Sequence, residues 1–307
     1  MNSSVSFVIF FSGSQILVYL SFLLFGTGLT LISGSDQSLI YESIKDKNDY
    51  TKYLGIYNAS AILALMISTG LGGNIAKYSW ILVFLLGMLA HILAAIMVWL
   101  MPDDLKQEKT HSNEKFINLN ETFSILKNIK FKYIAVMIIL TQSSGSIFYL
   151  YSAVILKDRN ISTQHISWIV AIFSFFGILA SIGLHRLENK FDKWKIIKFS
   201  LFTGTILYGV LFWNNIIIFL VAYMLIGYFY EIWDTSLNSQ LHEVVLDKYR
   251  TSSVSLVNTL TALLMAVQSI VIGLFEDKTS ILILLIGLIS NAIAFFIVFI
   301  AKSKISE

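Results

Sequence analysis

The side chains best suited to binding or moving an ion are carboxylates that interrupt long apolar runs. Asp36 ends one such run, and Glu231 and Asp234 stand near the end of another. An ionisable group in a membrane-crossing segment is costly and marks an ion or substrate path. For Glu231 two roles stay open: it binds a proton that drives coupling, or it pairs with Arg186 or Arg250 in a gate at one end of the protein. We assign all five residues to gating or coupling.

A second set of candidates consists of neutral polar side chains within apolar runs. Gln142, Ser146 and Tyr149 are spaced by four and three residues, so they share one helix face. Amides and hydroxyls that face lipid lose their hydrogen bonds to water, so this face should line a cavity or hydrogen-bond to a neighbouring helix. Thr30 and Tyr223 occupy comparable stripes in two other runs. The sequence therefore predicts substrate contacts at these five positions.

Motifs for enzymatic chemistry do not occur in the sequence. There is no zinc-binding helix motif, no nucleophile elbow and no pair of catalytic carboxylates that would face one pocket. Residues 68–73 look like a phosphate-binding loop, but neither the preceding strand nor the following Lys-Ser/Thr is present. Cysteine is absent, which excludes thiol chemistry and disulfides. We expect no catalytic residue, no metal, no cofactor and no enzymatic activity.

The composition places the chain in a lipid bilayer. Of its 307 residues 56% are hydrophobic and 13% are charged, whereas about 25% are charged in soluble domains. A membrane-spanning helix needs about 20 mostly apolar residues. About nine stretches satisfy this requirement: 15–41, 53–76, 80–101, 133–156, 165–185, 196–213, 215–236, 252–275 and 279–301. The sequence predicts an all-α polytopic membrane protein with these spans, preceded by a partial helix at the N-terminus.

The basic residues indicate how the chain crosses the membrane. Eighteen of the 22 lysines and arginines fall in alternate connections and at the adjoining helix ends; the other four are Lys77, Lys157, Arg159 and Lys278. Because short positively charged loops stay in the cytoplasm, the central connection and the C-terminus are predicted to be cytoplasmic. No basic stripe suggests nucleic acid. The expected partners are the lipid bilayer, a small molecule and protons.

The first and last parts of the chain repeat one pattern. The three complete runs before residue 102 and the last three runs have the same spacing, about 200 residues apart. In the first run of each set Asp36, Ser38 and Leu39 match Asp234, Ser236 and Leu237. Repeats of equal orientation are typical of transporters. We divide the chain into a truncated N-terminal bundle (1–101, a partial helix plus three spans), a cytoplasmic linker with an amphipathic helix (102–132) and a six-helix C-terminal bundle (133–307).

Several segments resemble, in sequence order, the major facilitator superfamily. Residues 26–41 resemble its fourth helix, residues 186–195 the basic loop between its eighth and ninth helices, and residues 234–238, 249–256 and Gly273 its tenth and eleventh helices. The resemblance implies a two-bundle permease of the bacterial drug or metabolite type in the cell membrane. Such a protein is a secondary transporter, expected to be ion-coupled, that moves a small molecule inward or as efflux by rocking of two halves.

The same resemblance implies that the first residues of the family pattern, about 65–70 in number, are absent: they would precede Met1. They would contain two helices, most of a third and the loop whose arginine pairs with the acid at Asp36. Two hypotheses therefore stay open. The chain is a transporter, or it is a truncated, non-transporting remnant or a fragment that requires a partner polypeptide for the missing helices.

Overall fold

The computed structural model describes residues 49–100, 128–245 and 250–305, together with isolated positions between 16 and 44. In these ranges the long elements are all helices, and no strand occurs. They are α4 (Tyr50–Ala76), α5 (Trp80–Trp99), α8 (Ile129–Leu150), α9 (Ser152–Lys157), α10 (Thr163–Glu188), α11 (Lys193–Val210), α12 (Ile216–Val244), α13 (Arg250–Leu274), the 3₁₀ turn η3 (Glu276–Lys278) and α14 (Thr279–Ile305).

Seven of the described helices are long and apolar enough to cross a membrane: α4, α5, α8, α10, α12, α13 and α14. Each coincides with one of the predicted runs, and α11, with 18 residues, coincides with the run 196–213. The predicted all-α polytopic fold is confirmed. The N-terminal partial helix, most of the run 15–41 and the amphipathic helix expected in the central connection lie outside the described residues.

The helix predicted at 133–156 has different limits in the structure. α8 begins at Ile129, because the side chain of Asn128 accepts hydrogen bonds from the backbone N–H groups of Lys130 and Phe131 and so caps the helix. The helix is interrupted at Tyr151, and the short helix α9 follows directly. The predicted span 133–156 therefore covers most of α8 and nearly all of α9. The start of α8 thus lies inside the segment assigned to the linker, and the bundle boundaries themselves stay a prediction.

The helix predicted at 215–236 is longer than expected. α12 runs for 29 residues, from a cap at Asn215 to Val244. Its polar last turns suggested exposure to water, but Ser236, Ser239 and His242 are buried against other helices. Because protein groups replace water as their neighbours, the helix continues through them.

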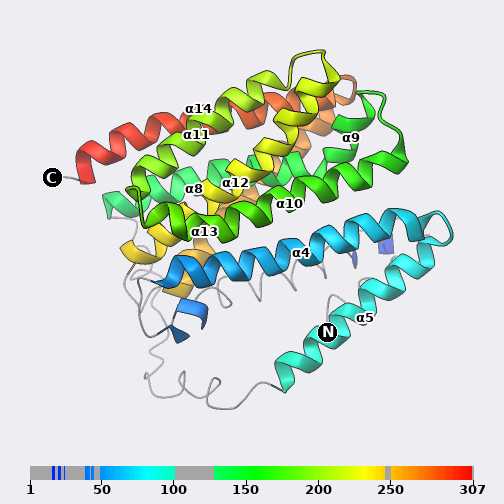
Figure 1. Ribbon diagram of the computed structural model, residues 1–307, viewed down its shortest axis with the longest axis horizontal. Helices are drawn as coiled ribbons and strands as arrows, with labels where there is room; N and C mark the ends of the chain where they lie inside the picture. Colours follow the sequence, from blue (N-terminus) through cyan, green and yellow to red (C-terminus); the bar gives the residue numbers. More distant parts are fainter. Residues whose placement is uncertain are drawn as a thin grey trace.

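The helices form a bundle in which α4 lies along α10 (Figure 1). The two helices are antiparallel: a Cβ atom on Gly55 would lie 2.5 Å from the carbonyl oxygen of Ser181, and one on Gly73 would lie 2.7 Å from the Oγ of Ser167. Glycine at both ends of α4 therefore allows the helix backbones to approach closely. α11 packs on α12 and α14, and α8 packs on α12, α13 and α14.

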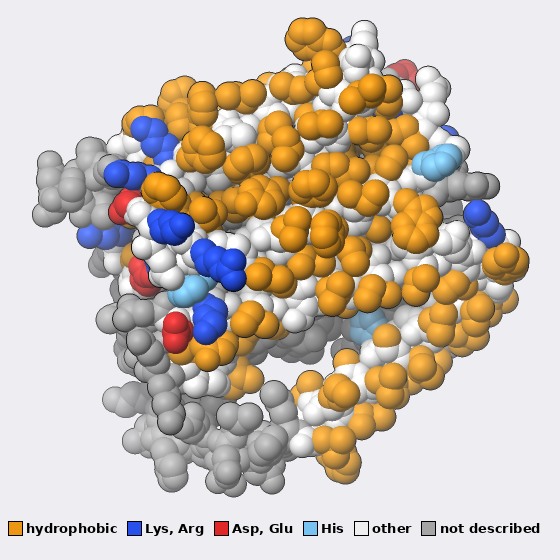
Figure 2. Space-filling view, in the orientation of Figure 1, with side chains coloured by type: hydrophobic (Ala, Val, Ile, Leu, Met, Phe, Trp, Pro, Cys, Tyr) orange, Lys and Arg blue, Asp and Glu red, His pale blue; other side chains and the backbone are white. Residues whose placement is uncertain are grey.

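Most lysines and arginines of the described helices gather at one end of the bundle, which we call the basic end. It contains the start of α4, the end of α10 and the start of α11, with Lys52, Arg186, Lys190, Lys193, Lys195 and Lys198. Figure 2 shows basic side chains at one edge of the visible face and hydrophobic side chains over most of the rest. This separation is the one expected of a bundle that presents apolar side chains to lipid and charges to water.

At the opposite end Arg159 closes the end of α11. Its guanidinium donates hydrogen bonds to the carbonyl oxygens of Leu211 (2.7 Å) and Trp213 (3.0 Å), and lies 4.6 Å from the ring centroid of Phe219. The last carbonyl groups of a helix have no partner within the helix. Arg159 supplies one with a planar group that also stacks on the aromatic ring.

We expect Arg159→Ala to lower the free energy of unfolding by about 2 kcal/mol, the range for hydrogen bonds that involve a charged group. The melting temperature of the detergent-purified protein should fall by several degrees, and Arg159→Lys should recover only part of the loss because an ammonium lacks the planar fork. Lys157→Ala, an exposed neighbour, is the control. Equal melting of the Arg159→Ala variant and the parent protein would disprove the cap.

Candidate substrate cavity and gate

A cavity of about 580 Å³ lies between α4, α8, α10 and α12, with further contributions from α11 and α13. This volume is in the range of small-molecule sites. The walls are mostly apolar and aromatic, with a few polar groups among them. The lining includes Ile62, Ser146, Phe148, Tyr149, Phe173, Gly177, Tyr208, Tyr230, Glu231 and Met265.

Glycines on three helices make room for the large side chains around the cavity. A Cβ atom on Gly145 would collide with the ring of Tyr230, and one on Gly177 would lie 3.1 Å from the Cγ of Glu231. A Cβ atom on Gly227 would lie 2.8 Å from the carbonyl oxygen of Phe173. The glycines thus set the positions of the side chains that form the cavity wall.

Glu231 lies at the middle of the bundle, deeper than its sequence position suggested. It is near the centre of the 29-residue helix α12. Gly177, near the middle of α10, faces both Glu231 and Ile62, which is near the middle of α4. The hydroxyl of Ser181 donates a hydrogen bond to the Oε2 of Glu231 at 3.3 Å. The prediction that Glu231 stands near the inner end of its helix was therefore wrong, because α12 continues to Val244.

No lysine or arginine of the described helices stands at the depth of Glu231. They are confined to about two turns at the helix ends: Lys52, Lys130, Lys132, Lys157, Arg186, Lys193, Lys195, Lys198, Arg250, Lys278, Lys302 and Lys304. The Arg186 side chain is exposed at the end of α10. The position of the Arg250 side chain lies outside the described part of the structure. Pairing of Glu231 with either arginine stays a prediction, for a conformation other than this one.

Asp234 lies one helical turn from Glu231 toward the basic end. The side chain of Gln142 lies near the Asp234 carboxylate, while the Oδ1 of Asp234 has no hydrogen-bond partner among the described residues. Asn238 donates to the backbone carbonyl of Asp234 at 2.9 Å. The structure thus places Gln142 beside a carboxylate between the cavity and the basic end. Contact of Gln142 with a substrate stays a prediction.

The other predicted substrate contacts have different positions. Ser146 and Tyr149 line the cavity, as the helical spacing predicted. Tyr223 is fully buried behind the wall, with ring centroids 5.2 Å from Phe148 and 5.1 Å from Phe173. Thr30 and Asp36 lie outside the described residues. Aromatic wall residues such as Phe173 were missed, because in sequence they are indistinguishable from side chains that face lipid.

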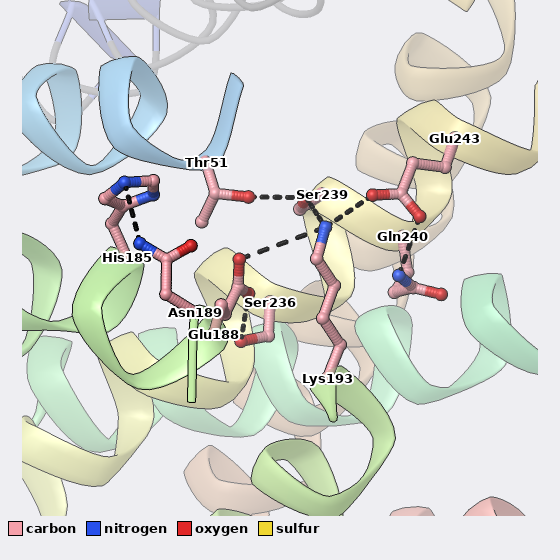
Figure 3. Close-up of polar contacts among 9 residues, drawn as sticks. All are labelled: Thr51, His185, Glu188, Asn189, Lys193, Ser236, Ser239, Gln240 and Glu243. Atoms are coloured by element: carbon pink, nitrogen blue, oxygen red, sulfur yellow. Dashed lines mark hydrogen bonds and ion pairs between the residues drawn. The ribbon is translucent and has the colours of Figure 1, made fainter. Parts of the chain in front are cut away.

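Between the cavity and the basic end, hydrogen bonds join α4 to α12. The hydroxyl oxygens of Thr51 and Ser239 are 3.0 Å apart (Figure 3), and the Nδ2 of Asn58 donates to the Oγ1 of Thr235 at 3.0 Å. Thr51, Thr235 and Ser239 are all buried. These contacts connect segments more than 170 residues apart in the sequence. They close the bundle on the side of the cavity that faces the basic end.

Charged residues at the ends of α10 and α11 extend these contacts. Glu188 accepts a hydrogen bond from Ser236 at 3.3 Å, and Thr51 lies near its carboxylate. Lys193 lies 3.9 Å from Glu188 and also pairs with Glu243 (Figure 3). A buried hydrogen bond contributes about 0.5–1.5 kcal/mol net, so the whole set is worth only a few kcal/mol. That is the range in which two conformations of a protein can interconvert.

Comparison with known proteins places this fold in a family. The model of the Major Facilitator Superfamily matches residues 3–269. The chain belongs to the Major Facilitator Superfamily, as the order of its motifs predicted, and proteins of this family are membrane transporters. No curated protein sequence matches the chain.

Solved structures of transporters share the fold. A variant of the Escherichia coli fucose:proton symporter FucP has a TM-score of 0.71 at 12% identity, with 98% of this chain and 81% of that chain covered. A bacterial homologue of the iron transporter ferroportin, in an outward-facing state, has a TM-score of 0.68 at 13% identity, with 98% and 80% covered. FucP in the outward conformation has a TM-score of 0.68 at 14% identity, with 97% and 80% covered. At such low identity the similarity shows the fold alone.

Proposed function

We propose that the protein is a secondary transporter that moves a small molecule across the cell membrane by alternating access, coupled to a proton gradient. The observation that carries the proposal is a cavity at mid-depth that a hydrogen-bonded network closes toward one end. Glu231 supports the coupling, because a half-buried carboxylate in a mostly apolar wall, with no basic partner among the described residues, favours a neutralising proton or cation. The proton-coupled symporter among the similar structures supports the same choice of ion.

The arrangement of the cavity and the network suggests which way the protein faces. On α8 the wall residues are Gly145, Ser146, Phe148, Tyr149 and Leu150, in the half of the helix nearer the end opposite the basic end. The distribution of lysine and arginine favours a cytoplasmic basic end and C-terminus. This conformation would then be closed to the cytoplasm. Separation of Thr51 from Ser239, with closure of the other end, would expose the cavity to the cytoplasm.

Alternating access can be tested without knowing the substrate, because the sequence contains no cysteine. A thiol introduced by Ser146→Cys should react with a membrane-impermeant maleimide in right-side-out vesicles and also in inside-out vesicles, since each conformation opens the cavity to one side. The controls for sidedness are two exposed positions near opposite ends of the bundle: Lys157→Cys, at the end of α9, and Lys190→Cys, just after α10.

The controls should each react from one side only, Lys157→Cys from outside and Lys190→Cys from the cytoplasm. If the controls behave in this way and the thiol at position 146 reacts from one side only, or from neither, alternating access is wrong. That result would instead support the non-transporting alternative. Reversed labelling of both controls would overturn the proposed orientation.

A further inference from the structure

We infer that the cavity binds an organic cation with a bulky apolar body, and that Glu231 neutralises its positive charge. The inference rests on the proposed transport function and specifies the class of substrate. The feature that leads to it is the combination of aromatic walls with one carboxylate that has no basic partner in the part of the chain that the structure describes.

The charges around the cavity favour a cation over an anion. Of the described wall residues Glu231 is the one with a charged side chain, and Asp234 adds a second carboxylate one turn away. From the other helices around the cavity, the polar groups near Glu231 are neutral: Ser181 on α10 and Tyr149 on α8. Taking a carboxylate out of water without a partner costs several kcal/mol. A cationic ligand supplies the missing partner, whereas an anion would be repelled by both acids.

The walls favour an apolar body over a polar one. Phe148, Phe173 and Tyr230 surround the cavity from three helices. Aromatic ring faces attract a cation within about 6 Å and also bury apolar surface. A molecule rich in hydroxyl groups would place most of them against apolar surface, because the wall is mostly apolar. Among the described residues its polar side chains are Ser146, Tyr149, Ser174, Tyr208, Tyr230 and Glu231. A sugar-like substrate is therefore disfavoured.

Binding of matched probes to the detergent-purified full chain tests the inference. Tetraphenylphosphonium and tetraphenylborate have the same shape and opposite charge, so their difference isolates the electrostatic contribution. In equilibrium dialysis we expect the chain to bind the phosphonium and to bind the borate at least 10-fold more weakly. Glu231→Gln should weaken phosphonium binding by 10-fold or more, which corresponds to about 1.4 kcal/mol.

The variants are chosen to separate charge from folding. Glu231→Gln keeps an oxygen that accepts the hydrogen bond from Ser181, and Glu231→Asp keeps the charge and should retain part of the binding. Asp277→Asn removes one negative charge at an exposed site in η3 and should bind like the parent protein. If Glu231→Gln fails to yield folded protein, the comparison of the phosphonium and the borate on the parent protein, together with Glu231→Asp, decides.

Equal binding of both probes, or unchanged binding by folded Glu231→Gln, would overturn the inference. This test requires no transport, so its failure differs from failure of the proposed function. Two-sided labelling at position 146 without phosphonium binding would support the proposed transport function and disprove the inference that the substrate is a cation. Phosphonium binding that requires Glu231, together with one-sided labelling at position 146, would support the cation site and disprove alternating access.

Discussion

Oxidation of the double variant Thr51→Cys/Ser239→Cys should trap the protein with its basic end closed. The two hydroxyl oxygens are 3.0 Å apart, on α4 and α12, and a disulfide needs its sulfur atoms about 2.0 Å apart. The chain has no other cysteine, so the bond can form only between the introduced thiols. A covalent bond across the network removes the open conformation completely, whereas the native hydrogen bonds only disfavour it.

The expected result is loss of labelling from the basic side in the triple variant that also carries Ser146→Cys. Labelling from the other side should persist, and a reductant should restore reaction from both sides. The controls are the variants that combine Ser146→Cys with Thr51→Cys alone or with Ser239→Cys alone; treated with the same oxidant, they should show no loss of labelling at position 146. If the cross-link forms in full and position 146 still reacts from the basic side, the network is not the gate.

The hydrogen bonds between α4 and α12 that close the basic end could not be predicted from the sequence. Thr51 and Ser239 are separated by 188 residues, and hydroxyl side chains are common in membrane helices, so nothing local indicates that the two meet. Glu188 and Lys193 lie in a segment that the basic pattern did single out. Their partners depend on how α4 crosses α10 and α12, which is a property of the packed bundle.

The positions of the spans were predictable, because each span depends on its own apolar residues and little else. Ser146 and Tyr149 were predictable for a related reason: polar groups at helical spacing must avoid lipid, whatever the partner. The depth of Glu231 was not. Its helix appeared to end at residue 236 because sequence alone offers only water as a partner for the polar groups that follow. The structure supplies Thr51, which contacts Ser239, and other protein groups instead.

We expect Gly55→Leu to force the basic end open. A Cβ atom at this position would lie 2.5 Å from the carbonyl oxygen of Ser181, a backbone atom that cannot rotate away. α4 must therefore move away from α10 at this point, which lies one helical turn from Thr51 and its hydrogen bond to Ser239. Overpacking of this kind costs about 1–3 kcal/mol, and 2 kcal/mol changes the ratio of two conformations about 30-fold. While the open conformation is the minor one, labelling of Ser146→Cys from the basic side should accelerate by a similar factor.

Gly72→Leu is the matched control on the same helix, because no described atom lies within 4 Å of its Cβ position. It adds the same apolar side chain and should leave the labelling rate unchanged. Gly55→Ala introduces the colliding Cβ with less volume, and it provides a folded variant if leucine prevents insertion into the membrane. Faster labelling in both Gly72→Leu and Gly55→Leu would reflect a general loosening of α4. Unchanged labelling in a folded Gly55→Leu protein would show that close contact of α4 with α10 at Ser181 does not control access to the cavity, because the wedge acts through that contact alone.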